Sequence, residues 1–183
     1  MLTSYNIGNS ILELICGDIT VQKTVAIANA ANRRLSPGGG VSGAIHKAAG
    51  PELWEECKQL GGCETGEAKL SGGHNLKAKY VIHTVGPVYS GSTDDVQDLK
   101  NCYKNSLLLA SQNNIKSISF PSISTGIFGY PVKEASVIAL KTIADFLKKH
   151  AEIELVRMVL FSEGDYKNYK SSLEKILKDK NAD

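Results

Sequence analysis

The feature that most constrains the fold of this chain is the alternation of short apolar segments with longer amphipathic ones. Short runs rich in Val and Ile, such as 11–16, 80–85 and 117–120, are typical of strands. Longer runs with apolar residues three or four positions apart, such as 95–113 and 132–149, are typical of helices. Strands that alternate with helices favour a mixed, mostly parallel sheet with helices on both faces. The predicted fold class is therefore α/β.

The remaining elements follow from the same patterns. We expect further strands at 4–7, 25–28, 67–70 and 155–161, and further helices at 41–49, 52–60 and 163–178. Gly50-Pro51 and Gly61-Gly62 are typical helix ends. Residues 178–183 are expected to form a frayed tail. Because the 183 residues contain no internal repeat and no long linker, we expect one domain over 1–183.

Composition excludes several classes of protein. At 42% hydrophobic and 22% charged residues, the chain is typical of a globular domain. Its net charge of +2, without a Lys/Arg stripe, argues against nucleic-acid binding, and Arg33-Arg34 is most simply solvated surface. No apolar run approaches the ~20 residues of a membrane span, and the N-terminus lacks a signal-peptide pattern. Four cysteines without a Cys-x-x-Cys pair favour a reducing compartment. We expect a cytoplasmic monomer.

Two glycine loops stand where the chain passes from a strand to a helix. The first contains Gly38-Gly39-Gly40, and the second, 121–131, contains Gly126 and Gly129. Such loops leave backbone N–H groups free at the positive end of a helix dipole, which suits a phosphate. In open α/β sheets, ligands bind beyond the carboxyl ends of the strands. Two loops at that edge suit a diphosphate better than a single phosphate.

Neither common nucleotide-binding motif fits these loops. The segment 38–43 formally matches G-x-G-x-x-G, but it stands too far from its strand for a dinucleotide-binding turn. No Gly-Lys-Ser/Thr follows either loop, which excludes a P-loop. Taken alone, the three glycines would be a flexible surface loop, and it is the second loop that favours a binding site.

Several polar side chains near the strand ends have both a structural and a functional interpretation. Asp18 either binds a ligand or caps a short helical turn, and capping is the commoner role. For Asn29 we favour a buried clamp on the backbone, and for Asn32 a position facing a ligand. His83 lies in an apolar strand and is predicted to be a core histidine. No His, Cys, Asp or Glu cluster has the spacing of a metal site.

Ser42 and two aromatic residues also have alternative interpretations. Ser42 and His46 share a helix face, but no third group would orient a Ser–His hydrolytic pair, so that pairing is not favoured. Phe128, at the apex of a glycine loop, either packs inwards or covers a ligand. For Phe161, at the end of a strand, core packing and stacking on a ligand ring are equally compatible with the pattern.

Seven short stretches of the sequence, taken together, resemble the motifs of a known family and occur in the same order. They are 17–20 (GDIT), 29–32 (NAAN), 38–41 (GGGV), 44–51 (AIHKAAGP), 65–68 (TGEA), 78–87 (AKYVIHTVGP) and 120–131 (FPSISTGIFGYP). Together they resemble the macrodomain family, most closely its MacroD-type branch of ADP-ribosyl hydrolases. The resemblance covers nearly the whole chain. It implies a three-layer α-β-α macrodomain that binds ADP-ribose and ADP-ribosylated proteins, without a cofactor or metal.

The resemblance also implies roles for individual residues. Asp18 would accept a hydrogen bond from the adenine amino group, with Phe161 against the ring. The backbone of both loops would hold the diphosphate. Phe128 would shield the distal ribose, and Asn32 would hold its hydroxyls and a water. The implied ligand-binding residues are Asp18, Ile19, Ala31, Gly38, Gly39, Gly40, Val41, Ser124, Thr125, Gly126, Ile127, Phe128 and Phe161, and the implied catalytic residues are Asn32 and Ser42.

One departure from the MacroD-type pattern bears on activity. Ser42 stands where that branch has an Asp that orients or activates water, and Pro37 replaces a usual glycine. The expected function is hydrolysis of ester-linked ADP-ribose, on protein Glu/Asp side chains or in O-acetyl-ADP-ribose, by a water held between Asn32 and the substrate diphosphate. The alternative is a non-catalytic ADP-ribose reader, because Ser42 is a poor base. A third option is a phosphatase acting on ADP-ribose 1″-phosphate.

Overall fold

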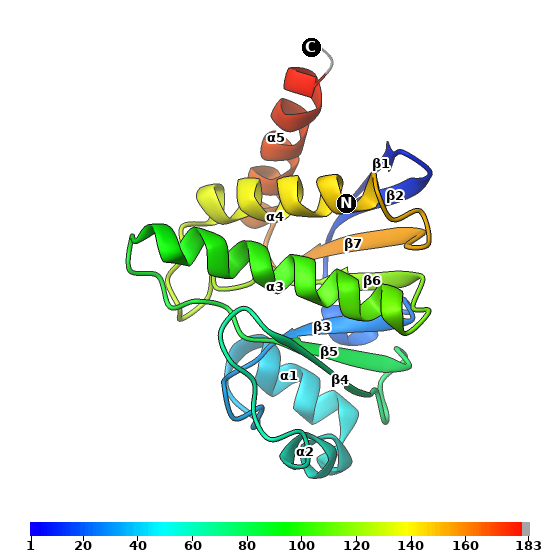
Figure 1. Cartoon of the computed structure of the whole chain (residues 1–183), viewed down its shortest axis with the longest axis vertical. Coiled ribbons are helices and arrows are strands. Elements are labelled where there is room, and N and C mark those ends of the chain that lie inside the picture. The colour runs from blue at the N-terminus through cyan, green and yellow to red at the C-terminus, as the bar shows by residue number, and fades with distance from the viewer. Residues whose placement is uncertain (181–183) are drawn as a thin grey trace.

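The computed structural model describes residues 1–180 and has a seven-stranded sheet with helices on both faces (Figure 1). The strands are β1 Leu2–Ile7, β2 Ser10–Cys16, β3 Ala26–Ala30, β4 Ala68–Gly72, β5 Tyr80–Thr84, β6 Ser117–Phe120 and β7 Leu155–Leu160. Their order across the sheet is β1-β2-β7-β6-β3-β5-β4. The edge pairs β1–β2 and β4–β5 are antiparallel, and the pairs between them are parallel. The predicted mixed, mostly parallel sheet is confirmed.

The helices form two layers around this sheet. They are the short η1 Ile19–Val21, α1 Gly40–Ala49, α2 Pro51–Lys58, α3 Thr93–Gln112, α4 Val132–Leu147 and α5 Glu163–Lys180. Alternate residues of one strand pack on opposite layers: in β5, Val81 belongs to the cluster of α1 and α2, and Ile82 to that of α3, α4 and α5. Figure 1 shows α1 and α2 at the bottom of the molecule and α5 at the top. Among residues 1–180, no helix is both long enough and apolar enough to cross a bilayer.

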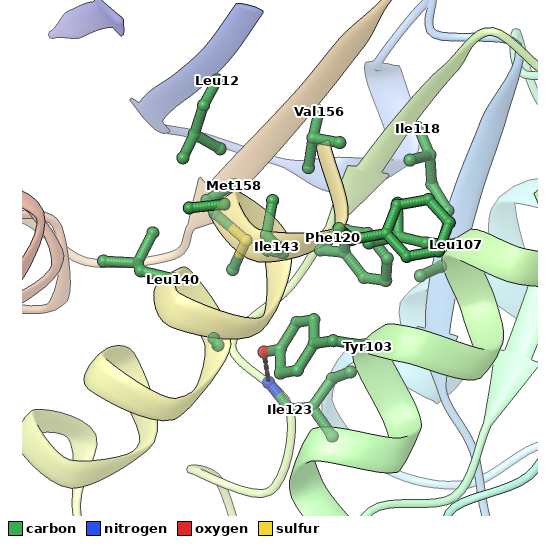
Figure 2. Close-up of a cluster of buried hydrophobic side chains, with 14 of the residues drawn as sticks. Leu12, Tyr103, Leu107, Ile118, Phe120, Ile123, Leu140, Ile143, Val156 and Met158 are labelled. Carbon is green, nitrogen blue, oxygen red and sulfur yellow. Dashed lines mark hydrogen bonds between the residues drawn. The ribbon is translucent and has the colours of Figure 1, made fainter. Parts of the chain in front are cut away.

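The larger core cluster holds the start of the second glycine loop in place. Figure 2 shows Tyr103 of α3 among aliphatic side chains from the sheet and from α4. Tyr103 is 1% exposed, and its Oη accepts a hydrogen bond from the backbone N–H of Ile123 at 3.2 Å. The same hydroxyl donates to the carbonyl of Pro121 at 3.3 Å. This loop is therefore anchored in the core at its beginning.

Several element ends differ from the sequence prediction by a few residues, and two of them affect the interpretation of single residues. β3 runs to Ala30, so Asn29 lies inside the strand, in register with His83 of β5, and not in the loop. α5 continues to Lys180, two residues beyond the predicted helix end. The Nζ of Lys180 pairs with the Oδ1 of Asp145 in α4 at 3.0 Å, which ties this helix end to its neighbour. Residues 181–183 lie outside the described part of the chain.

His83 is a core histidine, as predicted. Its side chain is 0% exposed, and its Nδ1 accepts a hydrogen bond from Asn29 Nδ2 at 3.2 Å. Its Nε2 lies 2.8 Å from Ser71 Oγ, to which it donates. Burial, with repulsion from the nearby His46, lowers the pKa of His83 to about 3. The imidazole therefore stays neutral in the folded protein.

This buried histidine predicts an acid-sensitive stability. In the unfolded chain His83 regains its usual pKa of 6.5, so the unfolded state binds more protons between that pH and about 3. The contribution of His83 to the free energy of unfolding is therefore fully present above the unfolded pKa of 6.5 and falls as the pH drops below it. We expect a loss of about 1.4 kcal/mol from this residue alone at pH about 5.5, measured by urea unfolding against pH about 7.5.

A pair of variants separates the contribution of the buried His83 from that of the exposed His74. His83→Gln is expected to be less stable at neutral pH but to lose this part of the pH dependence. His74→Gln, at an exposed site beside Glu56, is expected to retain it. Identical pH dependence in His83→Gln and the wild type would contradict the assignment.

Candidate functional site

A cavity of about 290 Å³ opens at the carboxyl ends of β3, β5 and β6. Both glycine loops line it, together with the end of β3 and Gly86, which follows β5. The lining residues are Ala30, Ala31, Asn32, Gly38, Gly39, Gly40, Val41, Ser42, Gly86, Ser122, Ser124, Gly126, Ile127 and Phe128. Of these, sequence reasoning missed Ala30, Gly86 and Ser122 as individual site residues.

The first glycine loop lies directly against the beginning of α1. The N–H groups of Gly40, Val41 and Ser42 belong to the first turn of this helix, where no acceptor exists within the helix itself. A Cβ added at Gly43 would come within 2.4 Å of the carbonyl oxygen of Gly38. The lack of a side chain at Gly43 therefore allows the loop to approach the helix this closely.

The second glycine loop carries a continuous row of free backbone donors. Within residues 1–180, the N–H groups of 124–128 form no hydrogen bond. Ser124 adopts a positive φ of 68°, a conformation that non-glycine residues rarely take. Successive free N–H groups in such a turn form a concave site for anions.

Hydrogen bonds from side-chain hydroxyl groups hold this second loop in place. The Oη of Tyr169 in α5 lies 2.7 Å from Ser122 Oγ. Thr125 Oγ1 donates to the carbonyl of Ser122 at 3.0 Å. With the contact of Tyr103 to Ile123, these bonds attach the loop to both α3 and α5. The free donors are therefore preorganised before any ligand arrives.

Asn32 lines the cavity and also holds its own loop closed. Its Nδ2 donates to the carbonyl of Ser36 at 2.9 Å, and its Oδ1 accepts from the N–H of Ser36 at 3.1 Å. The backbone clamp that we predicted for Asn29 is thus formed by Asn32. The prediction was wrong because Asn29 lies in β3, where sheet pairing uses the backbone groups, and its Nδ2 binds His83.

Two buried hydroxyl groups of the cavity have no partner. Ser42 and Ser124 are each 5% exposed, and within the described residues neither Oγ forms a hydrogen bond. An unpaired buried polar group costs about 1–3 kcal/mol, so both are suited to a ligand or water in the cavity. Both ring nitrogens of His46 are also unpaired and buried, and its pKa is lowered by burial. No Ser42–His46 hydrogen bond forms within residues 1–180, which agrees with the low expectation for that pair.

Asp18 and Phe161 follow the paired ends of β2 and β7, and neither lines the cavity. Asp18 caps η1, since its Oδ1 accepts from the N–H of Thr20 at 2.8 Å, and this confirms the predicted cap. Phe161 is 88% exposed, so core packing was the wrong alternative. The N–H of Gly17 donates to the carbonyl of Leu160 at 2.9 Å, which brings the chain ends of β2 and β7 together.

Two other predicted ligand contacts also lie outside the cavity lining. Ile19 is 6% exposed and packs in the core cluster of α1 and α2. Thr125 is half-buried and its hydroxyl binds Ser122. In the described part of the chain, no three His, Cys, Asp or Glu side chains are grouped to hold a metal ion.

Known proteins resemble this chain over most of its length. The family model described as "Macro domain" matches residues 28–139. The protein named ADP-ribose glycohydrolase MACROD2 of Xenopus laevis is 52% identical over 171 residues, which is 90% of this chain and 41% of that protein. The chain thus spans less than half the length of that curated relative.

Solved structures share the fold. The Oceanobacillus iheyensis macrodomain with ADP superposes with a TM-score of 0.95 at 44% identity, over 98% of both chains. The Trypanosoma brucei macrodomain in complex with ADP-ribose superposes with a TM-score of 0.84 at 43% identity, over 87% of this chain and 68% of that one.

Proposed function

Because this chain belongs to the macrodomain family, we propose that it binds ADP-ribose in the 290 Å³ cavity and hydrolyses esters of its distal ribose. The observation that carries this proposal is the pair of glycine loops that line one cavity with free backbone N–H groups. Such groups bind a diphosphate strongly, because hydrogen bonds to charged oxygens are stronger than those between neutral groups. A solved structure at 44% identity was determined with ADP.

In this proposal the two ends of the ligand lie on opposite sides of the loops. The adenine is bound outside the cavity, where Phe161 exposes its ring and, within residues 1–180, Asp18 accepts hydrogen bonds through Oδ1 alone. Ile19 lies beside the base. The distal ribose lies by Asn32, Ser42 and Phe128, which line the cavity together.

Hydrolysis requires a water close to the ester at the distal ribose. We propose that Asn32 holds this water and that the substrate diphosphate activates it, since Asn cannot act as a base. Asn32 has one Nδ2 hydrogen beyond the one it gives to Ser36. The proposed substrates are mono-ADP-ribosyl Glu/Asp side chains of proteins and O-acetyl-ADP-ribose. The name of the MACROD2 relative supports a hydrolase.

The test is release of free ADP-ribose from a glutamate-linked ADP-ribosylated protein. Asn32→Ala is expected to lower the rate at least about tenfold, because the water and the ribose each lose a hydrogen bond. Ser36→Ala, which removes only the hydroxyl contact of the loop clamp, is expected to stay within about twofold. An unchanged rate for Asn32→Ala would contradict the proposed role of this residue.

Ser42 favours a second candidate, an ADP-ribose reader without turnover. Its buried hydroxyl can bind the distal ribose, but at neutral pH it does not act as a general base. Calorimetry distinguishes the two: a reader binds ADP-ribose tightly and releases none from the ester substrate at high protein concentration. A protein that neither binds ADP-ribose nor releases it from the substrate would contradict both candidates.

A further inference from the structure

A second cavity, of about 410 Å³, adjoins the ADP-ribose cavity. It shares Asn32, Gly86 and Phe128 with that cavity, so the two meet beside the residues to which we assign the distal ribose. A group esterified to the distal ribose can extend into this second cavity, whose lining includes Arg33 and the carboxylates Asp95 and Asp98. The inference therefore rests on the proposed function.

A third cavity, of about 630 Å³, continues the path away from the ribose. Arg33 lines both the second and the third cavity and thus joins them. The third cavity is lined by Arg33, Arg34, Trp54, Lys58, Gly61, Gly62, Cys63 and Glu64. The position of Arg33 is fixed by the main chain, since its carbonyl accepts from the N–H of Cys63 at 2.8 Å.

The third cavity concentrates positive charge. Its lining has three cationic side chains, Arg33, Arg34 and Lys58, and one carboxylate, Glu64. The whole chain carries a net charge of only +2. Among residues 1–180, Arg33 and Arg34 form no ion pair, while Lys58 pairs with the exposed Glu55 at 2.6 Å. The Arg33 guanidinium donates to Thr65 Oγ1 at 3.3 Å and keeps further N–H groups, so both guanidinium groups can still pair with an anionic partner.

We propose that Arg33, Arg34 and Lys58 bind an acidic polypeptide segment next to the ADP-ribosylated side chain of the substrate. An extended peptide advances about 3.3 Å per residue, so a few residues beyond the modified position reach from the second cavity into the third. Exposed cations opposite acidic side chains select partners and raise association rates. The basic cavity thus sets sequence preference around the modification site, and it does not contact free ADP-ribose.

Trp54 allows occupancy of this cavity to be measured directly. It is the only tryptophan of the chain, it lines the third cavity, and Lys58 Nζ lies 5.4 Å from its ring centroid. The probe is a peptide carrying ADP-ribose through a non-hydrolysable amide, flanked by acidic residues. The comparison is the same peptide with Asn and Gln in place of those residues. The acidic peptide is expected to change the Trp54 fluorescence, and free ADP-ribose is not.

Removal of charge gives the second measurement. The double substitution Arg33→Gln, Arg34→Gln is expected to lower the affinity for the acidic peptide about three- to tenfold at low salt, and less at high salt. The affinities for the neutral peptide and for free ADP-ribose are expected to stay unchanged. Lys77→Gln, an exposed cation outside all three cavities, is the matched control and is expected to have no effect.

Three results with the peptides and variants would each overturn this inference. They are equal affinity of the wild type for the acidic and neutral peptides, no Trp54 response to the bound acidic peptide, or an equal loss of free ADP-ribose affinity in the double variant. A Trp54 response to poly(ADP-ribose) but not to the acidic peptide would assign the cavity to nucleotides and also overturn it. Failure of the proposed function gives a different result from failure of this inference, because free ADP-ribose would then not bind to the wild-type protein at all.

Discussion

Replacing Gly43 with alanine is expected to lower the affinity for ADP-ribose about ten- to hundredfold. The added Cβ would lie 2.4 Å from the carbonyl oxygen of Gly38, which is backbone and cannot rotate away as a side chain would. The first glycine loop must shift, and its N–H groups lose their alignment on the diphosphate. A hydrogen bond to a charged group contributes about 1.5–3 kcal/mol, so loss of one such bond accounts for this range.

The same substitution has opposing effects on stability. Alanine is favoured over glycine in a helix by about 1 kcal/mol, whereas overpacking costs about 1–3 kcal/mol. We therefore expect a larger change in affinity, measured by calorimetry, than in urea unfolding. Gly73→Ala is the control: its Cβ would lie 2.0 Å from the carbonyl of Ala78, away from the cavity, so stability falls and affinity is retained. Wild-type affinity in Gly43→Ala would contradict the proposed contact.

Replacing Ser42 with aspartate is expected to raise the rate of ester hydrolysis about a hundredfold. Ser42 lines the cavity in the first turn of α1, where a negative charge is favoured by the helix dipole. A carboxylate at this position would supply a general base next to the proposed place of the distal ribose, and such a base is typically worth ~10²–10⁴-fold in rate. The rate is measured as release of ADP-ribose from the glutamate-linked substrate.

Ser42→Asn is the matched control for this gain. It has nearly the shape of Asp without the charge, so the rate is expected to remain at the wild-type level or below it. An equal gain in both variants would show that side-chain size is responsible and not the base. No gain in Ser42→Asp would show that water activation does not use this position.

The fold and the position of the cavity followed from local patterns. Apolar periodicity is a local property, so the seven strands and five longer helices were recognised to within a few residues. The rule that ligands bind beyond the carboxyl ends of parallel strands then placed both glycine loops at one edge. The positive φ of Ser124 and the close approach at Gly43 are tertiary features, and no local signal predicted either.

The roles of single side chains were harder to predict from the sequence. Asn29 and Asn32 are identical residues three positions apart, and only the end of β3 at Ala30 decides which one can clamp a loop. Phe161 was ambiguous because strand periodicity does not say where the sheet stops covering a side chain. Arg33 and Arg34 are exposed, as predicted, but the cavity that they line with Trp54 of α2 brings together segments far apart in the sequence and had no local signal.

The donors of the second glycine loop are backbone groups, and this limits how the site can change. Exchange of a side chain at 124–128 leaves the N–H in place, except where proline is introduced. An inhibitor built around these amides would therefore leave few single substitutions that confer resistance. Those few would also weaken binding of the proposed ligand, ADP-ribose.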